Sequence, residues 1–218
     1  MVVATDAHVH RRRDAIRLLH ILNEAGEPVR GSRSDVPQLA VKVIKAEKKI
    51  QALDFWVRNP DYLAHELLEQ FEQSKDPELL VLAAQVMGGD EPDLRRLGML
   101  RHFFGAFERV DDAMATLKTH GLADVRVRLR GNKPIAREYF LLKAGAEKAA
   151  DFGPGDVLRW YSERAALVAR VAGDRAGDAL KNAQYTVEQY EGTRWGEIIA
   201  PITERVRSRL AALQEANP

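Results

Sequence analysis

The chain has 218 residues, of which 45% are hydrophobic and 30% are charged, and its formal net charge is +1. This composition excludes a disordered protein, and the length is sufficient to bury a core. Cysteine is absent from the sequence, which excludes disulfides and thiolate metal sites.

The near-zero net charge hides a strong segregation of charge along the chain. Residues 1–50 contain ten basic and six acidic side chains, whereas residues 51–125 contain seven basic and fourteen acidic ones. Residues 126–150 are basic again, with seven basic and two acidic side chains, and residues 151–218 are nearly balanced, with nine and ten. The local pattern, and not the total, therefore indicates which partners the protein binds.

The first part of the chain reads as an arm followed by helices. Residues 1–10 are predicted to be irregular, and a helix is expected from Arg11 to the break at Gly26-Glu27-Pro28. A long helix is expected over about 38–57, and Asn59-Pro60 separates it from another helix over 61–73. Outside the hairpin described below, Val2–Ala4 and Pro28–Arg30 are the candidate strands.

The middle of the chain continues with helical spacing. Asp76-Pro77 opens a helix that ends before Gly88-Gly89, and the pattern resumes after Pro92. The last helix of this series ends at Gly121, and four apolar residues are predicted to share its buried face: Val110, Ala113, Met114 and Leu117.

A β-hairpin is predicted over residues 123–142, with its turn at Gly131-Asn132-Lys133-Pro134. Side chains on a strand alternate between the two faces. We therefore expect Val125, Val127 and Leu129 to face the helices, and Arg126, Arg128 and Arg130 to project from the other face.

Helical patterns fill the remainder of the chain. A short helix is expected from Lys143, followed by helices over about 155–172, 176–191 and 195–214. The last one contains an apolar stripe that suits either a core or a partner surface: Ile198, Ile202, Val206, Leu210 and Leu213.

The order of these elements predicts a mainly α-helical fold with a small β-hairpin. A helix ending in Gly121, a hairpin and a further helix are typical of a winged helix-turn-helix core, in one module or possibly two, followed by C-terminal helices. We expect three consecutive segments: an N-terminal helical module over 1–75, which could itself be winged-helix-like, a winged-helix module over 76–152 with its wing at 123–142, and a C-terminal helical extension over 153–218.

A basic hairpin can lie on a phosphate backbone, where each neutralised phosphate releases counterions. The predicted nucleic-acid-binding residues are Arg126, Arg128, Arg130, Lys133, Arg137, Arg95, Arg96 and Arg101. The alternatives are that these side chains form an ordinary solvated surface, or that the basic wing contacts an acidic surface of a partner protein.

The helix before the hairpin suits a protein partner better than DNA bases. Asp111 and Asp112 stabilise its N-terminus, but they repel phosphates, so we expect no strong sequence preference. The predicted partner-binding residues are Asp111, Asp112, Ile198, Ile202, Val206 and Leu210.

Other motifs favour structural interpretations. Asp6, His8 and His10 resemble the opening of a metal-dependent hydrolase, but the barrel and later ligands that such a site needs are not indicated. The basic cluster at 11–13 suits a solvated helix face, or an arm that reaches a groove. The cluster at 30–33 could hold a phosphate but lacks the glycine spacing of a nucleotide loop, and the aromatic residues of 55–62 suit a core. We predict neither an enzyme nor a cofactor or metal. Because no apolar run or leader pattern is evident, we expect a cytoplasmic protein that does not bind a membrane.

The stretch "KKIQALDFWVRNPDYLAHELL" resembles a motif of the middle component of bacterial ABC three-component, or Lamassu-type, antiphage systems. Five of the matching positions are Lys49, Leu53, Asp54, Phe55 and Arg58, and the match continues through Pro60 and Leu63. The segments "MLRHFFGAFERVDDAMATLKTHGL" and "ALKNAQYTVEQ" are similar to later parts of the same family. The spacing of Lys49, the Phe107 in place of a tryptophan and the missing acidic ending depart from the family pattern.

This resemblance implies a non-catalytic winged-helix adapter subunit of an SMC-like ATPase complex. Its partners would be the SMC-like ATPase, an effector nuclease and double-stranded DNA without strong sequence preference. The alternative is a stand-alone transcriptional regulator with a winged helix, which would form a homodimer through its C-terminal helices.

Overall fold

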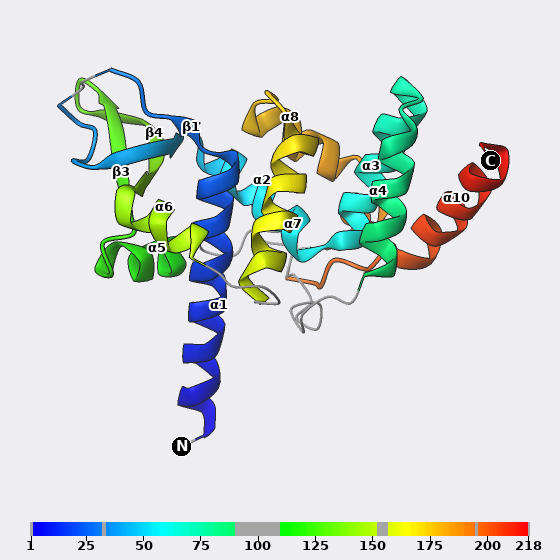
Figure 1. The fold of residues 1–218 in the computed structure, drawn as a ribbon, viewed down its shortest axis with the longest axis horizontal. Coiled ribbons are helices and arrows are strands. Elements are labelled where there is room, and N and C mark those ends of the chain that lie inside the picture. The colour runs from blue at the N-terminus through cyan, green and yellow to red at the C-terminus, as the bar shows by residue number, and fades with distance from the viewer. Residues whose placement is uncertain (1, 32–33, 90–109, 152–156, 195, 218) are drawn as a thin grey trace. The chain divides into compact units, whose positions relative to one another are not determined.

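The computed structural model describes residues 2–31, 34–89, 110–151, 157–194 and 196–217. This part of the chain is mainly helical and contains a small four-stranded antiparallel sheet (Figure 1). Two compact units are present: Met1–Asp54 with Glu108–Lys181, and Phe55–Phe107 with Asn182–Pro218. Each unit combines two separate stretches of the chain, whereas the sequence suggested three consecutive segments, and the three-module division stays a prediction.

The sheet belongs to the first unit. Its strands are β1 (Glu27–Pro28), β2 (Ala40–Ile44), β3 (Ala123–Arg130) and β4 (Lys133–Leu142), in the order β1-β2-β4-β3. The predicted hairpin is therefore confirmed as β3 and β4. Strand β2 pairs with β4, and this joins the hairpin to the N-terminal part of the chain.

The helix α1 (Val2–Ala25) forms the centre of this unit. It packs on α5 (Val110–Thr119), α6 (Lys143–Ala150) and α7 (Val157–Ala172), as well as on β2 and β4. Its buried Arg17 donates to Asp54 of α2 (Glu47–Arg58) at 2.5 Å, which holds α2 against α1. Gly145 lies in α6 so close to β3 that an added Cβ would come within 2.1 Å of the Leu122 carbonyl oxygen.

The second unit contains α3 (Pro60–Ser74), α4 (Pro77–Gly88), α9 (Glu188–Gly192) and α10 (Thr203–Ala216). The buried carboxylate of Asp61 accepts a hydrogen bond from the backbone N–H of Ile202 at 2.8 Å, and the Tyr62 hydroxyl donates to the Ala200 carbonyl at 2.9 Å. Arg209 of α10 contacts Glu69 and Glu72 of α3 at 2.7 Å each. The aromatic residues Phe55, Trp56 and Tyr62 are buried, as predicted.

The N-terminal predictions need two corrections. Residues 2–10 belong to helix α1 and form neither an irregular arm nor a strand. The predicted helix over 38–57 is wrong in its first part, because Ala40–Ile44 is strand β2 and α2 begins at Glu47. The pairing of Val43 with Phe140 and of Ile44 with Tyr139 decides this conformation, and a local helical spacing cannot reveal it.

The C-terminal predictions also change. The expected helix over 176–191 is two helices, α8 (Gly177–Tyr185) and α9, and the final helix begins at Thr203 and not at 195. The buried Asp61 holds the chain just before this start, through the Ile202 N–H and the Thr203 hydroxyl. Within the described residues, none of the helices combines the length and apolarity needed to cross a membrane.

Candidate nucleic-acid interface

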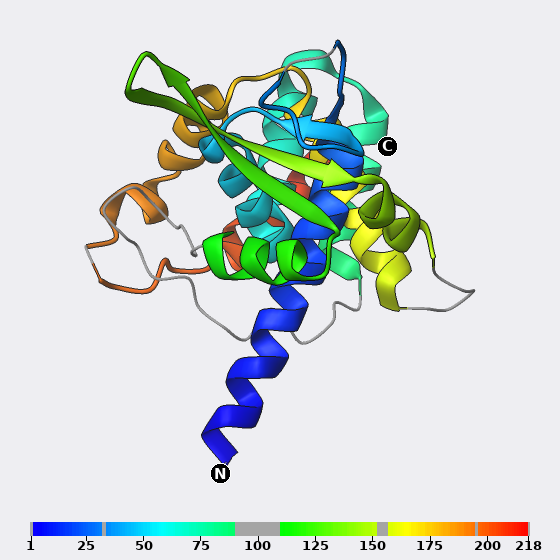
Figure 2. The same ribbon diagram turned by 90° about the vertical axis from the view of Figure 1, so that its left-hand side faces the viewer.

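The β3–β4 hairpin is the structural element that the basic pattern of the sequence singles out. Its turn contains Gly131, whose φ of +60° is a left-handed conformation that glycine adopts without a steric penalty. The strands are paired from Ala123↔Leu141 to Arg130↔Lys133, with an irregularity between Arg128 and Leu129. Figure 2 shows the hairpin extending past helix α5, which precedes it in the chain.

The two ends of this hairpin differ in burial. At the base, Ala123, Tyr139, Phe140 and Leu141 are buried in the core of the unit. Toward the turn, three aliphatic side chains are exposed: Val127 by 49%, Leu129 by 57% and Ile135 by 46%.

The prediction that Val127 and Leu129 face the helices is therefore wrong. Strand β2 covers β4 as far as Tyr139, where the pairing with Ile44 ends. Nearer the turn, β3 and β4 pair with each other, and no third strand of the described residues lies beside them. Apart from the irregularity after Arg128, the side chains still alternate, but among the described residues no core covers Val127 and Leu129.

The register distributes the cations over both faces of the hairpin. Residues directly opposite each other on antiparallel strands share a face. Arg126 is opposite Glu138, and Arg128 is two residues further along the same face, as predicted. Arg137 is opposite Val127 and therefore lies on the other face.

Three of the hairpin cations have carboxylate partners within the molecule. Arg126 contacts Asp124 at 2.7 Å, and Arg128 contacts Glu138 at 3.5 Å. Arg137 contacts Asp111 of α5 at 3.0 Å and Glu47 of α2 at 3.8 Å. All three guanidinium side chains are nonetheless close to half exposed, and ion pairs of this kind contribute about 1 kcal/mol or less. The pairs therefore reduce the positive field of the hairpin without closing these three side chains off from solvent.

Asp124 is the most strongly engaged of these carboxylates. It is buried, and it accepts from the backbone N–H of Val125 at 2.8 Å and from Lys118 and Arg126 at 2.7 Å each. Burial alone would raise the pKa of Asp124, but the Lys118 and Val125 hydrogen bonds and the charge of Arg126 outweigh it, and the pKa is lowered. This carboxylate therefore stays ionised and anchors the base of the hairpin to α5.

The turn carries cations of a different kind. Arg130 and Lys133 are opposite each other at the end of the hairpin, and both are exposed. Among the residues that the structure describes, neither has a carboxylate within ion-pair distance. The tip of the hairpin, defined here as Val127 to Ile135, thus combines two uncompensated cations, Arg130 and Lys133, with three exposed aliphatic side chains, and it also contains the paired Arg128.

Helix α5 presents little that could read a base sequence. Val110, Ala113, Met114 and Leu117 are buried, as predicted. Its other face carries Asp111 and Asp112 in the first turn, and Lys118 in the last turn is held by Asp124. Base edges are usually read by Arg, Lys, Asn or Gln side chains, so the exposed chemistry of α5 does not favour direct readout.

The predicted partner-binding residues differ in how far they are exposed. Asp111 is paired with Arg137, while Asp112 is exposed. Three residues predicted to bind a partner, Ile202, Val206 and Leu210, are buried in the second unit, and Ile198 is 59% exposed. In this conformation the stripe serves the unit's own core. Arg95, Arg96 and Arg101 lie outside the described residues.

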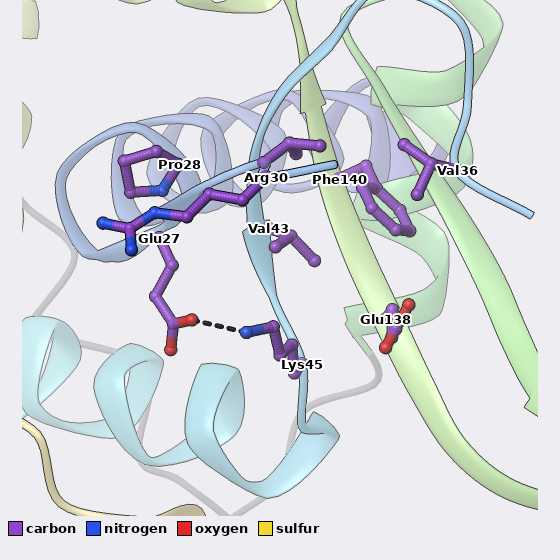
Figure 3. Close-up of a pocket in the computed structure, with 9 residues that line it drawn as sticks. Glu27, Pro28, Arg30, Val36, Val43, Lys45, Glu138 and Phe140 are labelled. Carbon is purple, nitrogen blue, oxygen red and sulfur yellow. Dashed lines mark hydrogen bonds and ion pairs between the residues drawn. The ribbon is translucent and has the colours of Figure 1, made fainter. Parts of the chain in front are cut away.

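A cavity of about 430 Å³ lies on one face of the sheet, and the sequence did not predict it (Figure 3). Its lining includes the apolar side chains of Val43 and Phe140, the buried carboxylate of Glu138 and an ion pair of 2.6 Å between Lys45 and Glu27. The lining comes from residues 27–45 and from β4, and only the pairing of β2 with β4 brings these stretches together. Within the described residues, no group of three or more histidine, aspartate or glutamate side chains could hold a metal ion.

Comparisons with protein-family models, with curated proteins and with solved structures find no match to this chain.

Proposed function

We propose that this protein is a non-catalytic winged-helix adapter subunit that contacts the DNA backbone through the β3–β4 hairpin. The observation that carries the proposal is the connection of the sheet. The chain order is α1, β1, β2, α2, α3, α4, α5, β3 and β4, and the strands lie side by side as β1-β2-β4-β3. A strand after the first helix that pairs with the last strand of a hairpin is the arrangement expected of a winged helix.

The charges of the hairpin support contact with phosphates. Arg130 and Lys133 are exposed at its end, and Arg126 and Arg128 are partly exposed on one face. Phosphate contacts position a protein on DNA without reading its sequence, and they release counterions. The acidic first turn of α5 supports the same interpretation, because Asp111 and Asp112 would repel a phosphate backbone. We therefore propose binding to double-stranded DNA without strong sequence preference.

The resemblance to the middle component of Lamassu-type systems supports a role inside a larger complex. In this proposal the protein joins an SMC-like ATPase and an effector nuclease, and it performs no catalysis itself. The acidic end of α5, with Asp111 and Asp112, and the exposed Ile198 are the candidate partner contacts. The motif residue Asp54 has a structural task in this chain, because it is buried against Arg17.

A homodimeric transcriptional regulator is the second candidate, and the burial of the C-terminal stripe argues against it. Ile202, Val206 and Leu210 would have to be exposed to form a dimer interface, yet they are buried within the second unit. Light scattering on the purified chain separates the two candidates. An adapter is expected near its monomer mass of 24.5 kDa, and a tight dimer would favour the regulator.

The DNA proposal is tested by the salt dependence of binding to a duplex of random sequence. We expect Arg126→Gln, Arg128→Gln and Arg130→Gln together to weaken binding and to reduce the slope of log K against log salt by about 3. Glutamine is chosen because glutamate would place a repelling charge beside Asp124 and the buried Glu138.

The matched control removes three exposed cations from helices outside the hairpin, through Lys148→Gln, Arg159→Gln and Arg207→Gln. This control should retain the affinity and the slope of the unmodified protein. An unchanged slope in the hairpin variant, or an equal loss in the control, would contradict the proposal.

A further inference from the structure

The tip of the hairpin carries apolar surface that a purely phosphate-directed contact does not use. Val127, Leu129 and Ile135 are exposed, and they lie on the same short segment as the uncompensated cations Arg130 and Lys133. At the base of the same hairpin, Tyr139, Phe140 and Leu141 are buried, and the cations Arg126 and Arg137 have carboxylate partners. The tip is therefore a part of the hairpin that combines exposed apolar surface with free positive charge.

The two properties together describe the chemistry of the tip's partner. Arg130 and Lys133 are complementary to an anionic surface. The aliphatic side chains are complementary to an apolar surface, which must lie within a few ångströms of the anionic groups. In duplex DNA, the phosphates flank the minor groove, and apolar side chains can insert between adjacent base pairs there. Major-groove and phosphate contacts made by cations alone would leave Leu129 and Ile135 in water.

The shape of the tip fits such an insertion. The axes of two paired strands lie about 4.8 Å apart, so the ribbon with its backbone atoms and side chains is wider than the minor groove of about 6 Å, and only side chains at the turn can enter the groove. Leu129 is opposite Pro134, and Ile135 has no opposite residue in β3, at the irregularity of the register. The fixed φ of Pro134 limits the freedom that this segment loses on binding.

We propose that the tip is a minor-groove wedge. Leu129 and Ile135 enter the groove and partly unstack one base step, while Arg130 and Lys133 contact the phosphates on either side. The wedge rests on the proposed function, because it requires that the hairpin binds duplex DNA. Easily deformed steps such as TA should accept it most readily, since they are the least costly to unstack.

The experiment uses the full chain and a duplex of about 20 base pairs with one central TA step, in which 2-aminopurine replaces the adenine. Unstacking of that base raises its fluorescence, and end-to-end energy transfer on a doubly labelled duplex reports a bend. We expect the unmodified protein to raise the fluorescence and to kink the duplex by about 20–90°.

The double variant Leu129→Ser with Ile135→Ser should lose the fluorescence rise and the bend. Its affinity is expected to fall about tenfold at constant salt, because apolar contacts are lost, but its salt slope should be unchanged. Both positions are exposed, so the variant should fold, and circular dichroism checks this. The control, Val81→Ser with Val157→Ser, removes equally exposed aliphatic side chains elsewhere and should behave as the unmodified protein does.

The outcomes separate the wedge from the proposed function. Salt-dependent binding without unstacking or bending overturns the wedge and leaves the DNA-binding proposal in place. Absence of duplex binding overturns both. A third outcome is that the unmodified protein binds vesicles of phosphatidylcholine and phosphatidylserine and does not raise the fluorescence of the duplex, while the tip variant no longer binds the vesicles. In that case the tip contacts lipid and the wedge is wrong.

Discussion

The base and the tip of the β3–β4 hairpin follow the same alternating sequence pattern but have opposite surroundings. At the base, Tyr139 and Phe140 are buried beside β2, and Asp124 holds Lys118 and Arg126. At the tip, Val127 and Leu129 are exposed although they continue the same pattern. The comparison teaches that alternation defines the two faces of a strand, whereas the neighbouring elements decide whether a face is buried. Stability should therefore depend on the base, and binding on the tip.

The largest expected effect is that of Phe140→Ala. Phe140 is almost fully buried and lies opposite both Asp124 and Val43 in the sheet. Truncation of a buried phenylalanine typically lowers the free energy of unfolding by about 3–5 kcal/mol. Urea denaturation followed by circular dichroism measures this loss. A change of less than about 1 kcal/mol would show that the base is not part of the cooperative core.

A smaller loss of stability is expected for Asp124→Asn, which keeps the shape of the side chain but removes its charge. The ion pairs with Lys118 and Arg126 are lost, and we expect the free energy of unfolding at neutral pH to fall by about 1–3 kcal/mol. The exposed Asp112→Asn is the control and should change it by less than about 0.5 kcal/mol.

The pH dependence of the unfolding free energy tests the charge of the same residue. Because the pKa of Asp124 is lowered on folding, its contribution is complete above the unfolded pKa of about 3.9 and is lost as the pH falls through the lower folded value. The difference in unfolding free energy between the unmodified protein and Asp124→Asn should thus be constant near neutrality and shrink in this acidic range. A difference that grew as the pH fell would rule out the proposed stabilisation.

The smallest effect is expected at the tip. Val127→Ala and Leu129→Ala should each change the free energy of unfolding by no more than about 0.5 kcal/mol, because both side chains are already exposed. The same urea titration measures them beside Phe140→Ala. A loss comparable to that of Phe140→Ala at either position would mean that the tip is buried, and the distinction between tip and base would disappear.

The sequence predicted those features of the fold that depend on local patterns. The hairpin follows from alternation around a glycine turn, and the buried face of α5 follows from the spacing of Val110, Ala113, Met114 and Leu117. Strand β2 was mistaken for helix because its conformation depends on β4, about a hundred residues later in the chain. The start of α10 depends in the same way on Asp61.

For the candidate site, the sequence identified the cations but not their partners. The contacts of Arg137 with Asp111 and Glu47 join three separate stretches of the chain, and no spacing rule connects such residues. The same limit applies to the cavity beside Glu138, whose lining depends on how β2 and β4 pair. The distinction between the cations that have carboxylate partners and the uncompensated Arg130 and Lys133 therefore needed three-dimensional information.

The close approach of Gly145 to the hairpin has a consequence for how this protein can diverge over time. An alanine there would meet the Leu122 carbonyl oxygen at 2.1 Å and a methyl of Leu141 at 2.8 Å, distances that real Cβ atoms do not tolerate. Replacement of an exposed arginine on the hairpin leaves the packing of the unit unchanged, but replacement of a helix residue that lies against the Leu122 carbonyl does not. Variants that keep the contact between α6 and the start of the hairpin must keep glycine at position 145. This fold therefore restricts position 145 more strictly than it restricts the exposed basic positions of the hairpin.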